Sequence, residues 1–202
     1  MSDLPENTRQ AGHDIHPMFL RRWSPRAFTG EEMPVADLMR MFEAANWAPS
    51  AFNYQPWQFV YARRETPEWG TFLNLLVPGN QMWAHAASAL VFLVSDRFMR
   101  LPGADPRPDY SHSFDTGAAW GYLALQCERM GYAAHGMTGF DRERAYEVLE
   151  VPEDGYRIEA AVAIGKQASP AVLPEAMQAR EKPNTRKPVE ESVFEGVFRA
   201  AT

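Results

Sequence analysis

The sequence predicts a fold that mixes α-helices and β-strands, because both periodicities occur in one chain of single-domain size. Helical spacing of apolar residues is found at 34–47 and at 113–131. Strand patterns lie at 57–62, 89–95, 133–137 and 158–165. A chain of 202 residues can bury roughly 70% of the surface that it exposes when unfolded. We therefore expect one domain with a full hydrophobic core.

The N-terminal segment shows no clear periodicity, so we expect a flexible arm at 1–16 and a folded domain at 17–202. The short apolar and basic run at 18–22 predicts a helix. Ser24-Pro25 would end it, because the residue before a proline is disfavoured in the helical region.

The next elements alternate helix, strand and helix. Pro34 suits the first position of an amphipathic helix that ends near Trp47. Residues 57–62 read as a strand with one aromatic face. A cap at Thr66 predicts a helix to about Val77, which Pro78-Gly79 would stop.

The middle of the chain is expected to supply the centre of the molecule. Residues 89–95 are almost continuously apolar, as in a strand that is covered on both faces. Residues 101–111 contain several prolines and predict an irregular loop. The helix at 113–131 is apolar nearly all round, so we expect it to be buried in the core or between subunits, with Gly117 and Gly121 allowing a close approach.

The C-terminal third contains two strands and a polar tail. Strands are expected at 133–137 and 158–165, separated by a helix that Asp141 would cap. The tail after 165 is punctuated by proline and carries one apolar stripe, formed by Val193, Phe194, Val197 and Phe198. A stripe of this kind needs a surface to cover, and a second subunit would provide one.

Composition narrows the function. The net charge of -6 argues against a nucleic-acid partner, and no apolar run reaches the ~20 residues of a membrane span. The N-terminus lacks the apolar segment of a secretory signal, so a cytoplasmic protein is expected. Cys127 is the single cysteine, which excludes an internal disulfide. Arg21, Arg22 and Arg26 form a basic cluster that suits a small anion, although such a cluster alone is more often a solvated face.

Several common sites are missing. The sequence has neither the G-x-G-x-x-G pattern of dinucleotide-binding folds nor a P-loop. Its histidines lack metal-ligand spacing, so no metal site is expected (His13, His16, His85, His112 and His135). Ser50 has no readable base and is a poor candidate nucleophile. Arginines, amides and hydroxyls of the remaining motifs could instead hold a flavin phosphate, ribityl chain and pyrimidine edge.

Two motifs carry a resemblance to a known family. Residues 21–28 read R-R-W-S-P-R-A-F, and residues 48–57 read A-P-S-A-F-N-Y-Q-P-W. At this spacing the chain resembles the FMN-dependent nitroreductase family from about Arg21 to Phe198. The resemblance implies an α+β fold with three layers, α/β/α, and an antiparallel-dominated central sheet. It also implies an intertwined homodimer with two FMN sites at the interface.

The resemblance assigns the cofactor site residue by residue. Arg22 and Ser24 would bind the phosphate, Arg26 would lie at the N1 side of the flavin ring, and Arg186 would close on the phosphate. Asn80 would be the ring-edge amide. The further positions that it implies are Trp23, Pro49, Ser50, Ala51, Asn53, Gln55, Met137, Thr138 and Gly139, of which 49–55 would reach the flavin of the partner subunit.

The implied activity is reduction of nitroaromatics, quinones or similar electron-poor acceptors by NAD(P)H in a ping-pong hydride mechanism. FMN carries the chemistry, so no side chain is expected to be a dedicated catalytic acid or base. Three alternatives remain open on the sequence. The first is an FMN enzyme of this fold with dehydrogenating, dehalogenating or flavin-cleaving chemistry, and the second is a flavin-binding protein without turnover. The third is a colourless structural dimer, in which Arg22, Ser24, Arg26 and Arg186 would be surface residues only.

Overall fold

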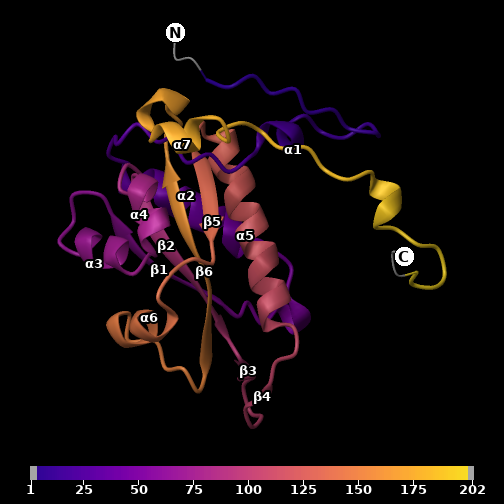
Figure 1. The fold of residues 1–202 in the computed structure, drawn as a ribbon. Coiled ribbons are helices and arrows are strands. Elements are labelled where there is room, and N and C mark those ends of the chain that lie inside the picture. The colour runs from indigo at the N-terminus through magenta and orange to yellow at the C-terminus, as the bar shows by residue number, and fades with distance from the viewer. Residues whose placement is uncertain (1–3, 200–202) are drawn as a thin grey trace.

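The computed structural model describes residues 4–199 and is built around a four-stranded sheet (Figure 1). The strand order is β1-β2-β6-β5, and every neighbouring pair is antiparallel. The strands are β1 (Trp57–Arg63), β2 (Ala89–Asp96), β6 (Tyr156–Gly165) and β5 (Ala133–Met137). β2 is buried at all of its residues, as its apolar sequence predicts.

Helices cover both faces of the sheet, and β2 shows how the sequence divides between them. Its residues Leu90, Phe92 and Val94 face a core with α3 (Trp69–Asn74), α4 (Pro78–Ala84) and α6 (Arg142–Val148). Its alternate residues Ala89, Val91 and Leu93 face a second core with α2 (Val35–Asn46) and α5 (His112–Arg129). Side chains alternate between the faces of a strand, so one apolar run fills two cores. The three-layer α+β architecture with an antiparallel sheet is confirmed (Figure 1).

Two local expectations were wrong. The helix expected to reach Val77 ends at Asn74, and Pro78 begins α4 instead of only stopping its predecessor. Proline suits this position because the first helical N–H needs no partner within the helix. The loop expected at 101–111 contains β4 (Arg107–Pro108), which pairs with β3 (Phe98–Met99) as a short hairpin.

Short helical segments complete the fold. They are α1 (Met18–Arg21), η1 (Ala51–Asn53), η2 (Pro170–Val172), α7 (Glu175–Gln178) and η3 (Val189–Glu191). Within residues 4–199, none of the helices combines the length and apolar character needed to cross a bilayer.

α5 is buried on one side and open on the other. Ala119, Leu123 and Cys127 are fully buried, whereas the side chain of Phe114 is 81% exposed. A Cβ added at Gly117 or Gly121 would meet no atom within 4 Å. In the single chain α5 is therefore buried on one side, and its open side carries the small and apolar residues of a packing surface. Burial of that side between subunits stays a prediction.

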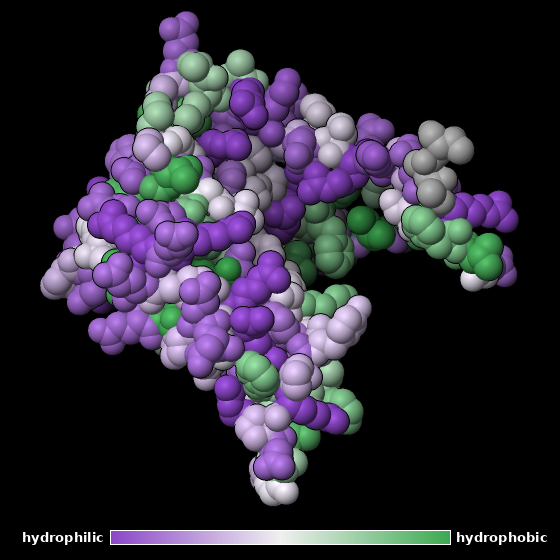
Figure 2. Space-filling model, turned by 60° about the horizontal axis from the view of Figure 1, so that its bottom comes forward, coloured by the Kyte–Doolittle hydropathy of each residue, from purple (hydrophilic) through white to green (hydrophobic). Residues whose placement is uncertain are grey.

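The tail leaves the body of the molecule. Figure 1 shows it extending to the right, and Figure 2 shows hydrophobic residues near its end. Val193, Val197 and Phe198 are exposed, and Phe194 contacts Phe198 edge-on at a centroid distance of 5.6 Å. Residues 4–17 form no helix or strand. The first three residues of the expected arm and the last three of the expected domain lie outside the described residues.

Candidate functional site

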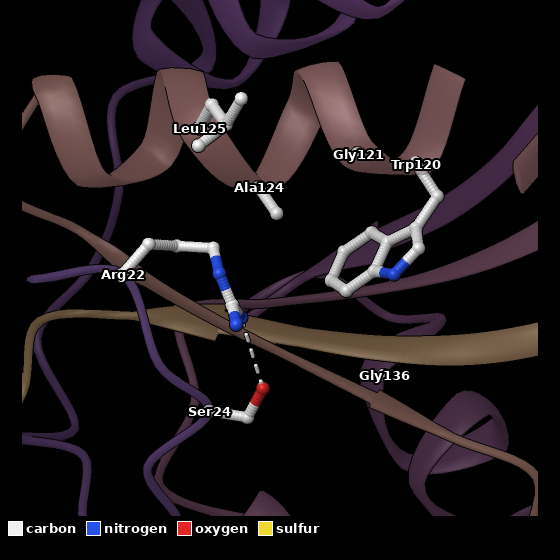
Figure 3. Close-up of a pocket in the computed structure, with 7 residues that line it drawn as sticks. All are labelled: Arg22, Ser24, Trp120, Gly121, Ala124, Leu125 and Gly136. Atoms are coloured by element: carbon white, nitrogen blue, oxygen red, sulfur yellow. Dashed lines mark hydrogen bonds between the residues drawn. The ribbon is translucent and has the colours of Figure 1, made fainter. Parts of the chain in front are cut away.

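A cavity of about 450 Å³ lies between α5 and the basic motif at 21–28 (Figure 3). Nη1 of Arg22 donates a hydrogen bond of 3.4 Å to Oγ of Ser24 beside it. The remaining lining comes from Gly136 of β5 and from Trp120, Gly121, Ala124 and Leu125 of α5. Small residues on both elements leave room above the two donors, so the cavity combines an apolar wall with a polar floor.

The backbone separates the two neighbouring arginines. α1 ends at Arg21, and Arg22 has an extended conformation with a ψ of 120°. Nε of Arg21 turns to Oε1 of Glu128 at 3.0 Å, while Arg22 faces the cavity. The expected basic cluster therefore divides into one arginine paired on the surface and one available to a ligand.

Arg186, in the tail, lines a neighbouring cavity of about 710 Å³ together with Arg9. Its Nη1 donates to Oδ1 of Asn184 and to the backbone oxygen of Thr185, both at 3.0 Å. Burial and then the charge of Arg186 lower the pKa of Arg22. Burial, Arg186 and Arg22 together lower the pKa of Arg9. Three neighbouring guanidinium groups repel one another, and a bound dianion such as a phosphate ester would offset that repulsion.

Arg26 is held by a buried carboxylate from the far end of the domain. Oε1 of Glu181 accepts hydrogen bonds from the backbone N–H of Arg26 at 2.5 Å and of Ala27 at 2.9 Å. Oε2 of Glu181 lies 3.8 Å from Nη1 of Arg26 and has no hydrogen-bond partner among the described residues. Glu181 is 2% exposed, so it anchors the motif from within the core.

β5 forms the wall next to this motif. Nδ1 of His135 lies 3.0 Å from the backbone oxygen of Pro25, and its ring lies 4.7 Å from that of Trp83. Burial lowers the pKa of His135, which favours a neutral ring whose Nδ1–H donates to Pro25. Trp23, which follows Arg22 in the chain and precedes Ser24 and Pro25, is half-buried.

The end of β5 meets the start of α4. Nδ2 of Asn80 donates to the backbone oxygen of Gly139 at 2.9 Å. A Cβ at Gly139 would lie 2.7 Å from that nitrogen, so glycine leaves the space in which the amide lies. Thr138 is exposed beside them, whereas the side chain of Met137 is buried in the core. The expected amide and glycine are therefore in direct contact.

The motif at 48–57 lies elsewhere in the single chain. Ser50 Oγ accepts from the backbone N–H of Gln55 at 3.0 Å, and Asp115 Oδ2 accepts from that of Ala51 at 2.9 Å. Pro49 and Asn53 are exposed. Ala51 and the β4 hairpin line a separate cavity of about 390 Å³. This cavity shares no lining residue with the cavity at Arg22. The structure does not bring these residues to the arginines of the same chain.

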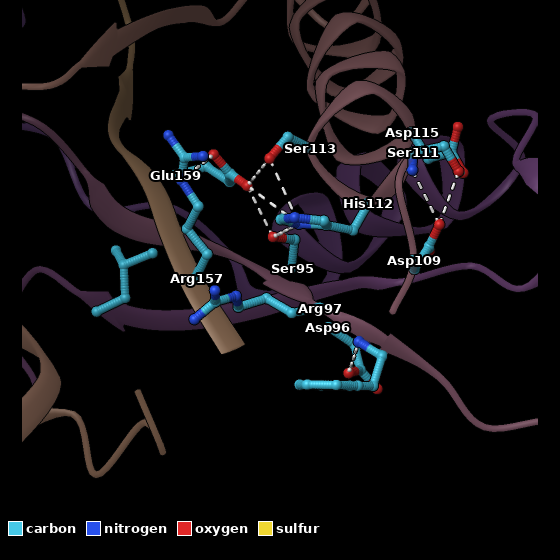
Figure 4. Close-up of polar contacts among 12 residues, drawn as sticks. Ser95, Asp96, Arg97, Asp109, Ser111, His112, Ser113, Asp115, Arg157 and Glu159 are labelled. Atoms are coloured by element: carbon cyan, nitrogen blue, oxygen red, sulfur yellow. Dashed lines mark hydrogen bonds and ion pairs between the residues drawn. The ribbon is translucent and has the colours of Figure 1, made fainter. Parts of the chain in front are cut away.

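A second polar cluster lies near the start of α5 (Figure 4). Oε1 of Glu159 accepts from the hydroxyls of Ser95 at 2.7 Å and Ser113 at 2.6 Å. Nδ1 of His112 lies 2.8 Å from the same Ser95 oxygen. A serine triad needs the imidazole between hydroxyl and acid, using both ring nitrogens. Here the carboxylate of Glu159 accepts hydrogen bonds directly from the hydroxyls, so the cluster does not have the geometry that activates a serine nucleophile.

Sequence reasoning missed four residues of this region: Arg9, Trp120, His135 and Glu181. Arg9 lies in a segment without periodicity, and Glu181 is one acid in a polar stretch. Nothing in the local sequence marks Arg9 or Glu181, because Asn184 and Ala27, which they contact, are distant along the chain. His135 could have been found, since alternation in a strand places it on the face opposite Ala134 and Gly136.

Comparison with known proteins assigns the class. The family model described as "Nitroreductase family" matches residues 20–69 and 66–166 of the chain. A crystal structure of an oxidoreductase containing FMN is 44% identical, with a TM-score of 0.93 over 97% of this chain and 98% of that one. The fold is thus that of a group of flavin-associated α+β proteins.

The chain belongs to the nitroreductase family. An NADH dehydrogenase of Thermus thermophilus is 31% identical over 179 residues, which cover 74% of this chain and 84% of the relative. A nitroreductase family protein from Streptococcus pneumoniae shares the fold at 20% identity, with a TM-score of 0.70 over 88% of this chain and 98% of that one.

Proposed function

We propose that this protein is an FMN-dependent oxidoreductase that uses NAD(P)H to reduce electron-poor acceptors such as nitroaromatics or quinones. The observation that carries the proposal is the placement of Arg22 and Ser24 in a cavity with an apolar wall, with the charge of Arg186 close enough to lower the pKa of Arg22. A phosphate ester attached to a wide apolar ring fits that combination. The FMN-containing oxidoreductase that is 44% identical supports the choice of ring.

The residues present fit FMN in three parts. Arg22, Ser24 and Arg186 would hold the phosphate, because guanidinium groups and hydroxyls donate to its oxygens. Arg26 would provide positive charge at the N1 side of the ring. The amide of Asn80 would meet the ring edge, and the backbone at 137–139 would donate to the ring, with Trp23 packing nearby.

FMN bound there supplies hydride transfer between NAD(P)H and the acceptor. The protein's own residues bind, orient and tune. Arg26, held by Glu181, would favour the negatively charged reduced form, and the apolar wall at Trp120 would limit access of water. No side chain needs to act as a dedicated acid or base.

We further propose that two chains complete each site in a homodimer. Support comes from the motif at 49–55, which is remote from its own chain's arginines and would reach the partner's flavin through Pro49, Ser50, Ala51, Asn53 and Gln55. The open side of α5 and the exposed stripe of the tail offer apolar surface for such an interface. Interfaces between permanent partners are typically large and apolar.

The visible spectrum tests the activity. Purified protein should be yellow, bleach anaerobically with NADH or NADPH, and regain colour when a quinone or nitroaromatic is added. A colourless protein that takes up no added FMN would overturn the proposal. Yellow protein that neither nicotinamide bleaches would indicate a flavin-binding protein without turnover.

Gly139→Ala should weaken FMN binding by roughly fivefold to tenfold, since one misplaced hydrogen bond costs about 1 kcal/mol. The added methyl group would displace the Asn80 amide, which lies in its way. Fluorescence titration of the apoprotein with FMN measures the change. Gly79→Ala is the matched control, because a Cβ there meets nothing within 4 Å. Equal affinities for both variants would remove Asn80 from the proposed site.

Gly117→Leu should convert the dimer to monomers. Within one chain a Cβ at this exposed position meets no atom within 4 Å, and leucine favours a helix over glycine by about 0.8 kcal/mol, so a monomeric protein would be stabilised. At a packed interface the same side chain would separate the two copies. Light scattering after gel filtration reports the mass. Gly70→Leu, at an exposed helical glycine of α3 with equal space, should remain dimeric.

A further inference from the structure

Arg9, in the N-terminal arm, joins three segments of the chain at the proposed phosphate site. Its Nη1 donates to the backbone oxygens of Leu20 at 3.2 Å and Arg22 at 2.8 Å. Its Nε and Nη2 donate to the backbone oxygen and Oδ1 of Asn184, both at 2.7 Å. One planar side chain thus ties the arm to the basic motif and to the tail.

Asn184 passes this contact on to Arg186. Its Oδ1 accepts from Nη2 of Arg9 and also from Nη1 of Arg186 at 3.0 Å. Asn7 reinforces the arm, because its Nδ2 donates to the backbone oxygen of Leu20 at 2.9 Å. Arg9 and Arg186 also line a cavity of about 710 Å³ between the arm and the tail. The position of Arg186 therefore depends on a residue that lies well before the basic motif.

The positive charges around Arg9 connect this contact to anion binding. Arg9, Arg22 and Arg186 carry three positive charges in one region, and the charge of Arg186 lowers the pKa of both others after the effect of burial. Four hydrogen bonds to protein oxygens occupy most of the donors of Arg9. Arg9 can then contribute to anion binding through its charge and through the segments that it holds, more than as a direct ligand.

We propose that Arg9 is a positioning residue for the phosphate of the cofactor, through which the N-terminal arm and the tail close on the site together. This proposal rests on the proposed function. Its ligand is the phosphate ester, so its effect should depend on the phosphate and not on the flavin ring.

The test compares FMN with riboflavin, which has the same ring and no phosphate. Arg9→Met should raise the dissociation constant for FMN about tenfold or more and leave that for riboflavin unchanged, as measured by fluorescence titration of the apoprotein. Arg9→Lys keeps the charge but lacks the planar fork, so it should recover only part of the affinity. Arg40→Met is the control, because Arg40 pairs with Asp37 on the surface of α2.

A second measurement reports on the tail. Hydrogen exchange at 183–187 should slow when FMN binds the wild type, and this protection should be lost in Arg9→Met. Unchanged FMN affinity in Arg9→Met, or equal losses for FMN and riboflavin, would overturn the proposal. Failure of the wild type to bind FMN would instead contradict the proposed function, so the two failures are distinguishable.

Discussion

Replacement of Arg22 by alanine is expected to raise the dissociation constant for FMN by roughly 10- to 100-fold. A charge-assisted hydrogen bond contributes about 1.5–3 kcal/mol, and 1.4 kcal/mol corresponds to about tenfold in affinity. Arg22 is half-buried at the cavity and oriented beside Ser24. Its loss would leave Arg186 as the main cation for the phosphate. Titration of the apoprotein with FMN measures the effect.

Arg26→Ala should act differently, because this guanidinium is proposed to face the ring. Loss of its charge would destabilise the reduced, anionic flavin and lower the midpoint potential by about 30–60 mV, at about 30 mV for each 1.4 kcal/mol in a two-electron couple. Arg21→Ala is the matched control, since that arginine pairs with Glu128. If Arg22→Ala and Arg26→Ala changed affinity and potential equally, the division of roles would be wrong.

Glu181→Ala should destabilise the protein by about 2–6 kcal/mol, because the backbone N–H groups of Arg26 and Ala27 lose their acceptor at about 1–3 kcal/mol each. Ala27 is fully buried, so water cannot replace the acceptor that its backbone N–H loses in this variant. Urea unfolding of the apoprotein, followed by circular dichroism, gives the change in the free energy of unfolding.

Glu181→Gln separates hydrogen bonding from charge. An amide oxygen can still accept from Arg26 and Ala27, so most of the stability should return. The charge beside Arg26 is gone, however, and the midpoint potential of bound FMN should rise. A destabilisation by Glu181→Ala below about 1 kcal/mol would show that Glu181 does not anchor the motif.

The fold was largely predictable because its strands have strong local signals. The apolar run of β2 predicted a central strand, the alternation of β1 predicted its neighbour, and Asp141 caps α6 through the N–H of Arg144 as expected. Prediction failed where one residue has two meanings. Pro78 can end one helix or begin another, and only packing of Trp83 in the core decides between them.

The candidate site was predictable where its residues form motifs. Arg22 and Ser24 were found together, as were Asn80 and Gly139, although the roles of these residues stay predictions. Arg9 and Glu181 could not be found, because each contacts a segment more than a hundred residues away. Arg9 donates to Asn184 in the tail, and Glu181 accepts from Ala27 in the basic motif. Spacing in a sequence reports contacts within an element, and these two contacts join opposite ends of the chain.

The basic motif at 21–28 is supported by residues that lie far later in the chain. Phe28 bridges to Gln167, Ala27 accepts from the N–H of Ala168, and Glu181 holds the turn between them. Because a chain leaves the ribosome from its N-terminus, the motif at 21–28 cannot complete these contacts until residue 181 has been synthesised. We therefore expect the proposed phosphate site to form only after that residue has emerged.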